Sequence, residues 1–384
     1  MRSRRLPVLL VVSLWACSVA AQDGLFSDQR TPGEGRISGN YVSLPSMSRD
    51  IARIRTISQT LSDEIPLVIA HRGASGYLPE HSTEAVSFAH ALGADFIEQD
   101  VVMSRDGVVM VMHDVTLDDV TDVANAFPGR QRDGRFYAWD FTEAELKQLK
   151  VRERFPVEGK SGAWHRFPKS SGTFRFATFE EHIQLIQGLN HTRRRNTGLY
   201  VELKHPDQHH AQGLDLAKAV LHILKKYGYS TAEHRAIVET FDEREVLRIR
   251  TELDCRLPLV QLLLETPTEE KLNEISRIAD GIGVPVTSVV TGASAEDPPV
   301  PVISSLVKDA HERALMVHVW TYRVDALPDF VADPQRLLSW LIRDAGVDGI
   351  FADQPDVLVD WRAANQHVRR HGPFRLLNSG RDAD

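Results

Sequence analysis

The sequence predicts an α/β fold in which eight parallel strands close into a (β/α)8 TIM barrel, with a long insertion after the second strand. Short apolar runs alternate with amphipathic segments from residue 67 to residue 352, and eight such runs occur. This alternation is typical of parallel sheets, and a closed barrel of this kind needs about 250 residues. An open doubly wound sheet is the alternative, but the sequence lacks the glycine-rich dinucleotide turn that would support it.

The apolar runs are expected to form the barrel strands, because strands buried on both faces are apolar along their whole length. In chain order these runs cover residues 67–70, 95–102, 199–203, 236–240, 257–263, 281–284, 315–321 and 347–352. The amphipathic segments between them predict helices over residues 211–227, 243–252, 268–278 and 301–313. Each strand and the helix after it therefore make one repeat of the barrel.

One segment interrupts this alternation. Residues 115–176 are rich in Arg, Gly, Asp and aromatic residues, and the segment is far longer than an ordinary connection between a strand and a helix. We expect an insertion on the catalytic face of the barrel, either as a lid or pocket wall or as a mobile surface loop. The barrel domain is then expected over residues 61–365, with an N-terminal extension over 22–60 and a polar tail over 366–384.

The N-terminus has the pattern of an export signal. Three arginines lie among the first five residues, an apolar run covers residues 6–12, and small residues lead to Ala21. The apolar run is too short for a transmembrane helix. We therefore expect a signal peptide over residues 1–21 and an exported mature chain, periplasmic or secreted, without an integral membrane span. A lipoprotein anchored through Cys17 is the alternative, because residues 14–17 resemble a bacterial lipoprotein processing site.

The formal net charge of −8 argues against a general nucleic-acid-binding protein, which needs a basic surface. An acidic protein can still act on an anionic substrate where local cations or a bound metal reverse the field in the cleft. Cys17 and Cys255 are the two cysteines of the chain. Loss of a signal peptide leaves Cys255 alone, so we expect a fold large enough to need no disulfide.

Charged residues stand where the first two strands end, which is where TIM barrels gather their chemistry. His71 and Arg72 follow the first run. An imidazole transfers protons near neutral pH, and a guanidinium forks two donors onto phosphate oxygens. Glu98 and Asp100 stand two residues apart in the second run, so their side chains share one face. Two carboxylates aimed into one cavity repel each other unless they share a proton or a cation, and oxygen ligands suit Ca²⁺ or Mg²⁺.

The third strand repeats this spacing. Glu202 and Lys204 stand two residues apart near its end, as a third carboxylate and a fixed positive charge for phosphate, or else as a simple ion pair. The Asp106–Gly107 pair predicts a hairpin turn, and the short strand after it would return His113 to the same rim. Two histidines that flank one phosphate can serve as general base and general acid. Taken alone, such a histidine is more often an ordinary loop residue.

Taken together, several motifs resemble, in order, those of the glycerophosphodiester phosphodiesterase family. The resemblance spans about residues 65–362, and its motifs cover residues 71–81, 93–100, 106–107, 113–114, 202–204, 318–321 and 348–353. Several motifs in the right order are far more specific than any one of them. The insertion, at residues 133–137 and 140–142, resembles the larger periplasmic, calcium-using branch of the family.

The resemblance implies an enzyme that hydrolyses glycerophosphodiesters to sn-glycerol 3-phosphate and an alcohol. In that family the glycerol hydroxyl of the substrate attacks first, and water then opens the resulting cyclic phosphate. His71 and His113 would be the acid–base pair, while Arg72 and Lys204 would bind the phosphate. The expected partner is a small-molecule glycerophosphodiester, and the sequence leaves the oligomeric state open.

The resemblance also implies a metal cofactor. Glu98, Asp100 and Glu202 would hold Ca²⁺, with Mg²⁺ as the alternative. Trp320 would pack against the glycerol of the substrate, unless it only fills the core. Glu239 departs from the family, which usually has glutamine at this position, and its carboxylate would either alter the metal preference or face away.

Other functions stay open at this stage. The protein is alternatively a surface-exposed binding protein or adhesin that kept the fold, or an enzyme resembling phospholipases C or D. A pure binding protein has no need of unpaired acids in its core, so the histidine, arginine and carboxylate set argues against that alternative. His205, His209 and His210 also suggest a zinc site, although we expect them in a solvated loop.

Overall fold

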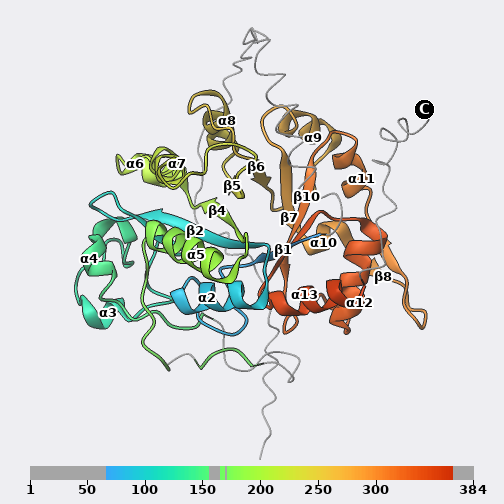
Figure 1. Cartoon of the computed structure of the whole chain (residues 1–384), viewed down its shortest axis with the longest axis horizontal. Coiled ribbons are helices and arrows are strands. Elements are labelled where there is room, and N and C mark those ends of the chain that lie inside the picture. Colours follow the sequence, from blue (N-terminus) through green and yellow to red (C-terminus); the bar gives the residue numbers. More distant parts are fainter. Residues whose placement is uncertain (1–65, 155–164, 169–170, 366–384) are drawn as a thin grey trace, which may run out of the picture. The chain divides into compact units, whose positions relative to one another are not determined.

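The computed structural model describes residues 66–154, 165–168 and 171–365 (Figure 1). Eight parallel strands form a closed sheet, because β1 pairs with β2 on one side and with β11 on the other. In spatial order the barrel strands are β1 (Leu67–Ala70), β2 (Phe96–Met103), β4 (Gly198–Leu203), β5 (Ala236–Thr240), β6 (Leu259–Leu262), β7 (Gly281–Pro285), β10 (Met316–Tyr322) and β11 (Gly349–Ala352). The predicted TIM barrel is confirmed, and each predicted run supplies one strand.

The expected signal peptide, N-terminal extension and polar tail lie outside the described residues. Helices surround the barrel and connect its strands (Figure 1). Outside the insertion they are α2 (Thr83–Leu92), α5 (Phe179–Arg193), α6 (Pro206–Ala211), α7 (Leu216–Lys226), α8 (Glu243–Thr251), α9 (Glu269–Ile275), α10 (Val286–Val289), α11 (Leu306–His311), α12 (Pro334–Ser339), the π-helix η2 (Trp340–Ala345) and α13 (Pro355–Ala364). None of the helices in the described part of the chain has the length and apolarity that a bilayer span requires.

The structure corrects two predicted helices, those over residues 211–227 and 301–313. The first is two helices, α6 and α7, because Gly213 lies between them with a φ of 76° and Asp215 caps the second helix. The second is only α11, because β9 (Pro301–Ile303) pairs antiparallel with β8 (Val290–Ala293). The β-branched residues of β9 suit this hairpin better than a helical turn.

The inside of the barrel is apolar towards the N-terminal ends of the strands and charged towards their C-terminal ends. Alternate side chains of a strand face the same way, so Phe96, Glu98 and Asp100 of β2 all point inward. The apolar inward residues form one interior cluster: Leu67, Ile69, Phe96, Tyr200, Ile237, Val260 and Phe351. The alternate residues, such as Ile97 and Val201, belong to the larger core between sheet and helices. The charged mouth of the barrel therefore rests on a buried, largely apolar base.

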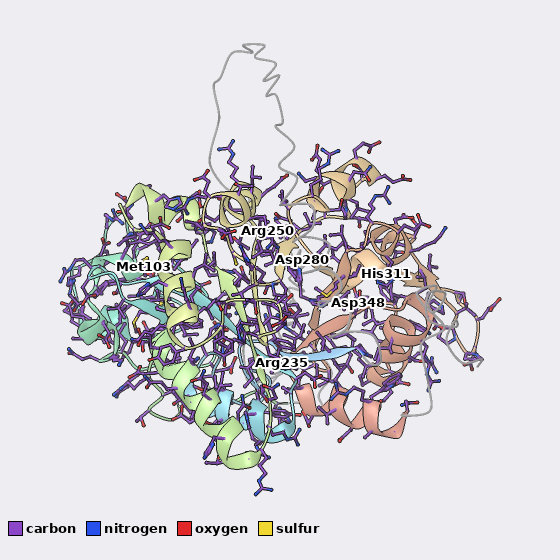
Figure 2. The ribbon with its side chains drawn as sticks, turned by 45° about the horizontal axis from the view of Figure 1, so that its top comes forward. Met103, Arg235, Arg250, Asp280, His311 and Asp348 are labelled. Atoms are coloured by element: carbon purple, nitrogen blue, oxygen red, sulfur yellow. The ribbon has the colours of Figure 1, made fainter. Side chains whose placement is uncertain are left out.

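Three aspartates stand directly before strands at the N-terminal end of the barrel. Asp95, Asp280 and Asp348 precede β2, β7 and β11, and each carboxylate accepts a backbone N–H from the neighbouring strand at 2.7–2.9 Å. Asp280 also pairs with Arg250 at 2.6 Å, and Asp348 pairs with His311 at 2.8 Å (Figure 2). These bonds satisfy backbone N–H donors and join neighbouring strands. They lie at the N-terminal end of the strands, the end of a TIM barrel that contributes to stability rather than to catalysis.

The described parts of the insertion pack beside β2. β3 (Val109–Val111) runs antiparallel to β2 after a turn at Gly107, whose φ is 80°, as the sequence predicts. The helices α3 (Val123–Ala126), η1 (Ala138–Asp140) and α4 (Glu143–Leu146) follow. A second apolar cluster, separate from the barrel core, includes Met110, Met112, Leu117, Val120, Val123, Phe136, Phe141, Leu146, Leu149, Val151, Phe174 and Phe176. The described part of the insertion is therefore a packed layer with its own core.

Replacement of Asp280 by Ala is expected to lower the free energy of unfolding by about 3–5 kcal/mol, because it leaves the buried Arg250 guanidinium without its carboxylate partner. It also removes the acceptor of the Leu259 N–H. Urea unfolding followed by circular dichroism measures this change. Replacement of the exposed Asp360 on α13 by Ala is the control, and its effect should stay within about 0.5 kcal/mol. Equal midpoints for the two variants would contradict the role of the Asp280 pair.

Candidate active site

A tight turn after β1 brings His71 and Arg72 to the barrel mouth. Arg72 has a φ of 55° and Gly73 a φ of 82°, so two successive residues adopt the left-handed conformation. A Cβ at residue 73 would lie 2.9 Å from the carbonyl carbon of Ala85, so only glycine fits against α2. The backbone N–H of Arg72 donates to Glu98 Oε2 at 2.6 Å, which ties this turn to β2.

Four carboxylates from three neighbouring strands converge at the mouth. Asp100, Glu202 and Glu239 are register partners across β2, β4 and β5, and Glu98 shares the inward face of β2. All four side chains are buried, with at most 9% exposed. Oxygens of Glu98, Glu202 and Glu239 lie within 4.8 Å of one another, so Glu239 faces the site. Glu98 Oε1, Asp100 Oδ1 and Glu239 Oε2 accept no hydrogen bond from a described residue.

This carboxylate cluster fits a hard divalent cation. Burial, together with neighbouring carboxylates, raises the pKa of Glu98 and of Glu239 well above the usual range. Burial also raises the pKa of Glu202 to about 7, although Lys204 opposes this. Oxygens that are buried, convergent and without donors are the ligands that Ca²⁺ and Mg²⁺ prefer, and a bound cation would relieve their mutual repulsion.

The two cations that the sequence assigns to phosphate stand beside these acids. Lys204 Nζ donates to Glu202 Oε1 at 2.6 Å and lies 3.6 Å from Asp100 Oδ1. Arg72 Nε lies 3.3 Å from Asp100 Oδ2, and His81 Nε2 lies 2.8 Å from the same oxygen. Burial alone would raise the pKa of Asp100, but Lys204 and the other nearby cations hold that pKa well below its usual range. Asp100 is therefore ionised and surrounded by protein donors.

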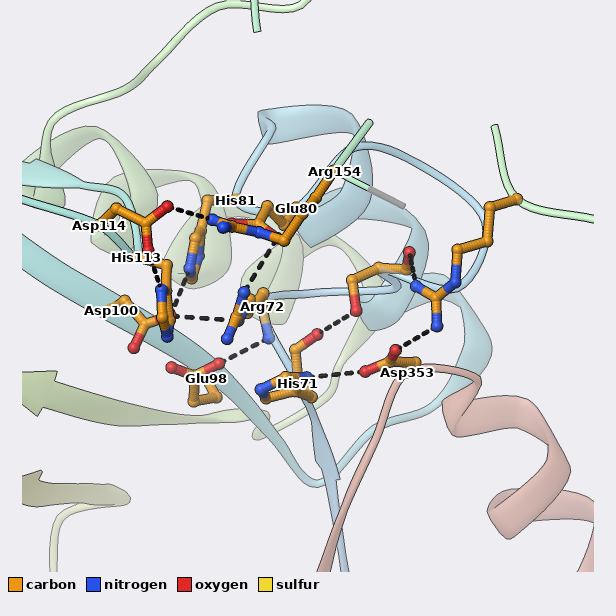
Figure 3. Close-up of polar contacts among 12 residues, drawn as sticks. His71, Arg72, Glu80, His81, Glu98, Asp100, His113, Asp114, Arg154 and Asp353 are labelled. Atoms are coloured by element: carbon orange, nitrogen blue, oxygen red, sulfur yellow. Dashed lines mark hydrogen bonds and ion pairs between the residues drawn. The ribbon is translucent and has the colours of Figure 1, made fainter. Parts of the chain in front are cut away.

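Each of the two predicted catalytic histidines is held by an aspartate (Figure 3). His71 Nδ1 lies 2.7 Å from Asp353 Oδ1, and His113 Nδ1 lies 2.5 Å from Asp114 Oδ1. The carboxylates favour a proton on Nδ1 and leave Nε2 of each ring as the proton-accepting atom. His113 Nε2 lies 3.1 Å from Lys204 Nζ, so it faces the charged mouth. Burial, and next the Arg72 charge, lowers the pKa of both rings to about 4.

Two arginines of the insertion hold these aspartates in turn. Arg166 donates to Asp353 Oδ2 at 2.6 Å and also binds Asp325. Arg154 NH2 lies 2.7 Å from Asp114 Oδ2, and the same guanidinium donates to both oxygens of Glu80 at 2.8 and 3.0 Å (Figure 3). The insertion therefore positions both histidines indirectly, through the aspartates that its arginines bind.

Sequence reasoning missed these supporting residues. Asp114 and Asp353 lie inside recognised motifs, but the sequence assigned them no role. Arg166 lies 187 residues from Asp353, and Arg154 lies 74 residues from Glu80. No spacing rule connects residues so far apart, so the two arginines carried no signal in the sequence.

Trp320 lies on β10 and packs against the interior cluster. Its ring meets the ring of Phe241 edge to face, with 5.9 Å between the centroids. The Phe241 ring centroid lies 5.9 Å from Lys204 Nζ. Trp320 is thus both a core contact and, through Phe241, a neighbour of the charged mouth.

The three histidines after β4 do not form a zinc site. His209 is buried, its Nε2 accepts the N–H of Met103 at 3.0 Å, and its Nδ1 donates to the carbonyl oxygen of His205 at 3.0 Å. Met103 belongs to β2 and is labelled in Figure 2. The solvated loop expected here holds for His205, which is exposed and precedes α6, but is wrong for His209 and His210, which lie in α6.

Comparison with known proteins decides the family. Residues 71–357 match the glycerophosphoryl diester phosphodiesterase family. The chain belongs to this family. A glycerophosphodiester phosphodiesterase of Haemophilus influenzae is 39% identical over 334 residues, which cover 79% of this chain and 91% of that protein. A glycerophosphodiester phosphodiesterase of Treponema pallidum is 35% identical, over 76% of this chain and 90% of that protein.

Solved structures show the same fold. A phosphodiesterase of Oleispira antarctica, in complex with the product sn-glycerol-3-phosphate, has a TM-score of 0.55 at 20% identity and covers 78% of this chain and 97% of its own. A glycerophosphodiester phosphodiesterase of Parabacteroides distasonis has a TM-score of 0.53 at 20% identity and covers 79% and 99%. The family predicted from the sequence is confirmed, and with it the prediction of a phosphodiesterase enzyme.

Replacement of Asp353 by Asn is expected to lower the kcat of this phosphodiesterase by about 10²-fold or more, because an amide no longer selects the Nδ1–H tautomer of His71. Steady-state release of sn-glycerol 3-phosphate measures the effect. Replacement of Asp356 by Asn is the matched control, since Asp356 lies three residues further on, in the first turn of α13, and accepts the Tyr77 hydroxyl; kcat should be unchanged. A folded Asp353→Asn variant with full kcat would contradict the role of Asp353.

Proposed function

We propose that this enzyme hydrolyses glycerophosphodiesters to sn-glycerol 3-phosphate and an alcohol. The observation that carries the proposal is the pair of aspartate-held histidines, His71 and His113, in one barrel mouth with the phosphate-binding candidates Arg72 and Lys204. The names of the Haemophilus influenzae and Treponema pallidum relatives support it. A binding protein would need neither two oriented imidazoles nor the buried acids beside them.

In the proposed reaction the substrate supplies its own nucleophile. The glycerol hydroxyl next to the phosphate attacks phosphorus, and the bond from phosphorus to the alcohol oxygen breaks. The Nε2 atom of one histidine accepts the hydroxyl proton, while the other histidine donates a proton to the departing alcohol oxygen. Water then adds to the cyclic phosphate with the two roles exchanged, and one ring P–O bond breaks. The products are sn-glycerol 3-phosphate and the alcohol.

The positions of Lys204 and Arg72 support this assignment of roles. Lys204 Nζ lies 3.1 Å from His113 Nε2, so a phosphate oxygen bound to Lys204 comes within reach of that ring. Arg72 lowers the pKa of both histidines in the substrate-free site. A phosphate bound to Arg72 offsets this charge and so favours the protonated form of the histidine that acts as the acid. Trp320, with Phe241, is the proposed apolar wall for the glycerol carbons.

We propose Ca²⁺ as the cofactor, with Mg²⁺ as the alternative, held by Glu98, Asp100 and Glu202. The buried oxygens without donors in this cluster support the proposal. A bound divalent cation would lower the pKa of the attacking hydroxyl and stabilise charge on a phosphate oxygen. The number of carboxylates favours Ca²⁺, which takes about 6–8 oxygen ligands, over Mg²⁺, which keeps several waters.

Release of sn-glycerol 3-phosphate from glycerophosphocholine tests the proposed function directly. We expect activity that EGTA abolishes and added Ca²⁺ restores. Activity that survives EGTA but not EDTA would keep the reaction and replace Ca²⁺ by Mg²⁺. A folded protein without activity on any glycerophosphodiester in the presence of either ion would refute the proposal.

The affinity for Ca²⁺ is expected to rise with pH through about 7. Burial raises the pKa of Glu202 in the metal-free site to about 7, so below that pH the carboxyl group is mostly protonated and must lose its proton to bind a cation. One pH unit below this value, the affinity should be at least about tenfold weaker than above it. Isothermal titration in buffers of different ionisation enthalpy measures both the affinity and the released proton. Equal affinities with no proton release would contradict this expectation.

We also propose export to the periplasm or the medium, with anchoring through Cys17 as the alternative. The arginines and the apolar run of residues 1–21 support export, and these residues lie outside the described part of the chain. Fractionation of an expressing bacterium, followed by N-terminal sequencing of the protein, tests the proposal. A first residue of Gln22 outside the cytoplasm would support export with cleavage after Ala21, and a protein retained in the cytoplasm with an uncleaved N-terminus would refute it.

A further inference from the structure

Glu239 is the fourth carboxylate at the barrel mouth, and it has no role in the proposed function. It lies on the inward face of β5, two residues after Ile237 of the interior cluster, and is the register partner of Glu202. Its side chain is buried, with 2% exposed. Its Oε2 accepts no hydrogen bond from a described residue. An unpaired buried carboxylate is costly, so its position needs a physical reason.

Asp100 has cationic side chains as partners, whereas Glu239 has none in the part of the chain that the structure describes. Asp100 Oδ2 lies 2.8 Å from His81 and 3.3 Å from Arg72, and Asp100 Oδ1 lies 3.6 Å from Lys204. Among the described residues, no ion pair within 4.0 Å joins Glu239 to a Lys, Arg or His. A cation from solution is therefore the natural partner for Glu239.

The spacing of the carboxylates suits such a cation. Glu98, Glu202 and Glu239 each offer an oxygen, and these oxygens lie within 4.8 Å of one another. Ca²⁺ binds oxygens at about 2.3–2.6 Å, so two of its ligands are separated by at most about twice that length. Oxygens of the three glutamates from β2, β4 and β5 therefore lie close enough together to share a single ion.

We propose that Glu239 is an additional carboxylate ligand of the metal site and that it strengthens the preference for Ca²⁺ over Mg²⁺. This inference rests on the metal site of the proposed function and adds the β5 strand to it. Ca²⁺ gains most from a further carboxylate because it takes more oxygen ligands than Mg²⁺ and accepts irregular geometry. Glu239 thus acts through the ion that it binds.

Isothermal titration of the metal-free protein with Ca²⁺ and with Mg²⁺ tests the inference. Glu239→Gln keeps the shape of the side chain and removes its charge. We expect Ca²⁺ binding at least about tenfold weaker, and a smaller loss for Mg²⁺. The rise in melting temperature that Ca²⁺ causes should shrink accordingly, while the metal-free variant should melt no lower than the unchanged protein. Glu312→Gln, on an exposed residue outside the barrel mouth, is the control and should bind both ions normally.

A third variant separates the inference from the proposed function. Glu98→Gln removes a ligand that the proposed metal site already requires, so it should weaken binding of both ions. If the unchanged protein binds neither ion, the proposed metal site itself is wrong. If Glu98→Gln weakens Ca²⁺ binding but Glu239→Gln binds Ca²⁺ and Mg²⁺ as the unchanged protein does, only the role of Glu239 is overturned.

Discussion

The constraint on which the rest of this structure depends is the burial of four carboxylates, Glu98, Asp100, Glu202 and Glu239, above an apolar base inside a closed barrel. Such a group of acids is unfavourable unless cations lie next to it. Lys204 supplies part of that charge at 2.6 Å from Glu202, while oxygens of Glu98, Asp100 and Glu239 accept no hydrogen bond from the described residues. Carboxylates repel an anionic ligand, so such a site can accept a phosphodiester only where cations balance its negative charge.

The insertion helps to orient the imidazoles of His71 and His113, which come from different elements. His71 comes from the end of β1, and His113 follows β3. Each ring is fixed by an aspartate, and Arg166 and Arg154 fix those aspartates with charge-assisted bonds. The second apolar cluster anchors the described insertion against β2 and β3, so the arginines sit on a packed layer. The orientation of His71 and His113 thus depends on the insertion as much as on the barrel.

The two ends of the barrel divide stability from chemistry. At the N-terminal end, carboxylates such as Asp280 are matched by backbone N–H groups and by cations, and they join neighbouring strands. At the C-terminal end, one oxygen each of Glu98 and Glu239 accepts no hydrogen bond from the part of the chain that the structure describes. Buried charges with hydrogen-bond and ion-pair partners stabilise a fold, whereas buried charges without such partners indicate a ligand-binding site. Because side chains two residues apart share a face, β2 alone contributes Phe96 to the apolar base and Glu98 to the charged mouth.

The sequence by itself determined the barrel and the residues of its mouth. Apolar runs mark strands, and a period of two puts Glu98 and Asp100, and likewise Glu202 and Lys204, on inward faces, because that periodicity is local. The same rule, applied from Ile237, would have turned Glu239 inward. Helix boundaries near residues 211 and 301 were wrong because turns and strand pairing overrode helical periodicity. Only the tertiary structure decided that arginines of the insertion hold the aspartates behind His71 and His113, because residues as far apart as 187 positions meet through packing, which no local pattern encodes.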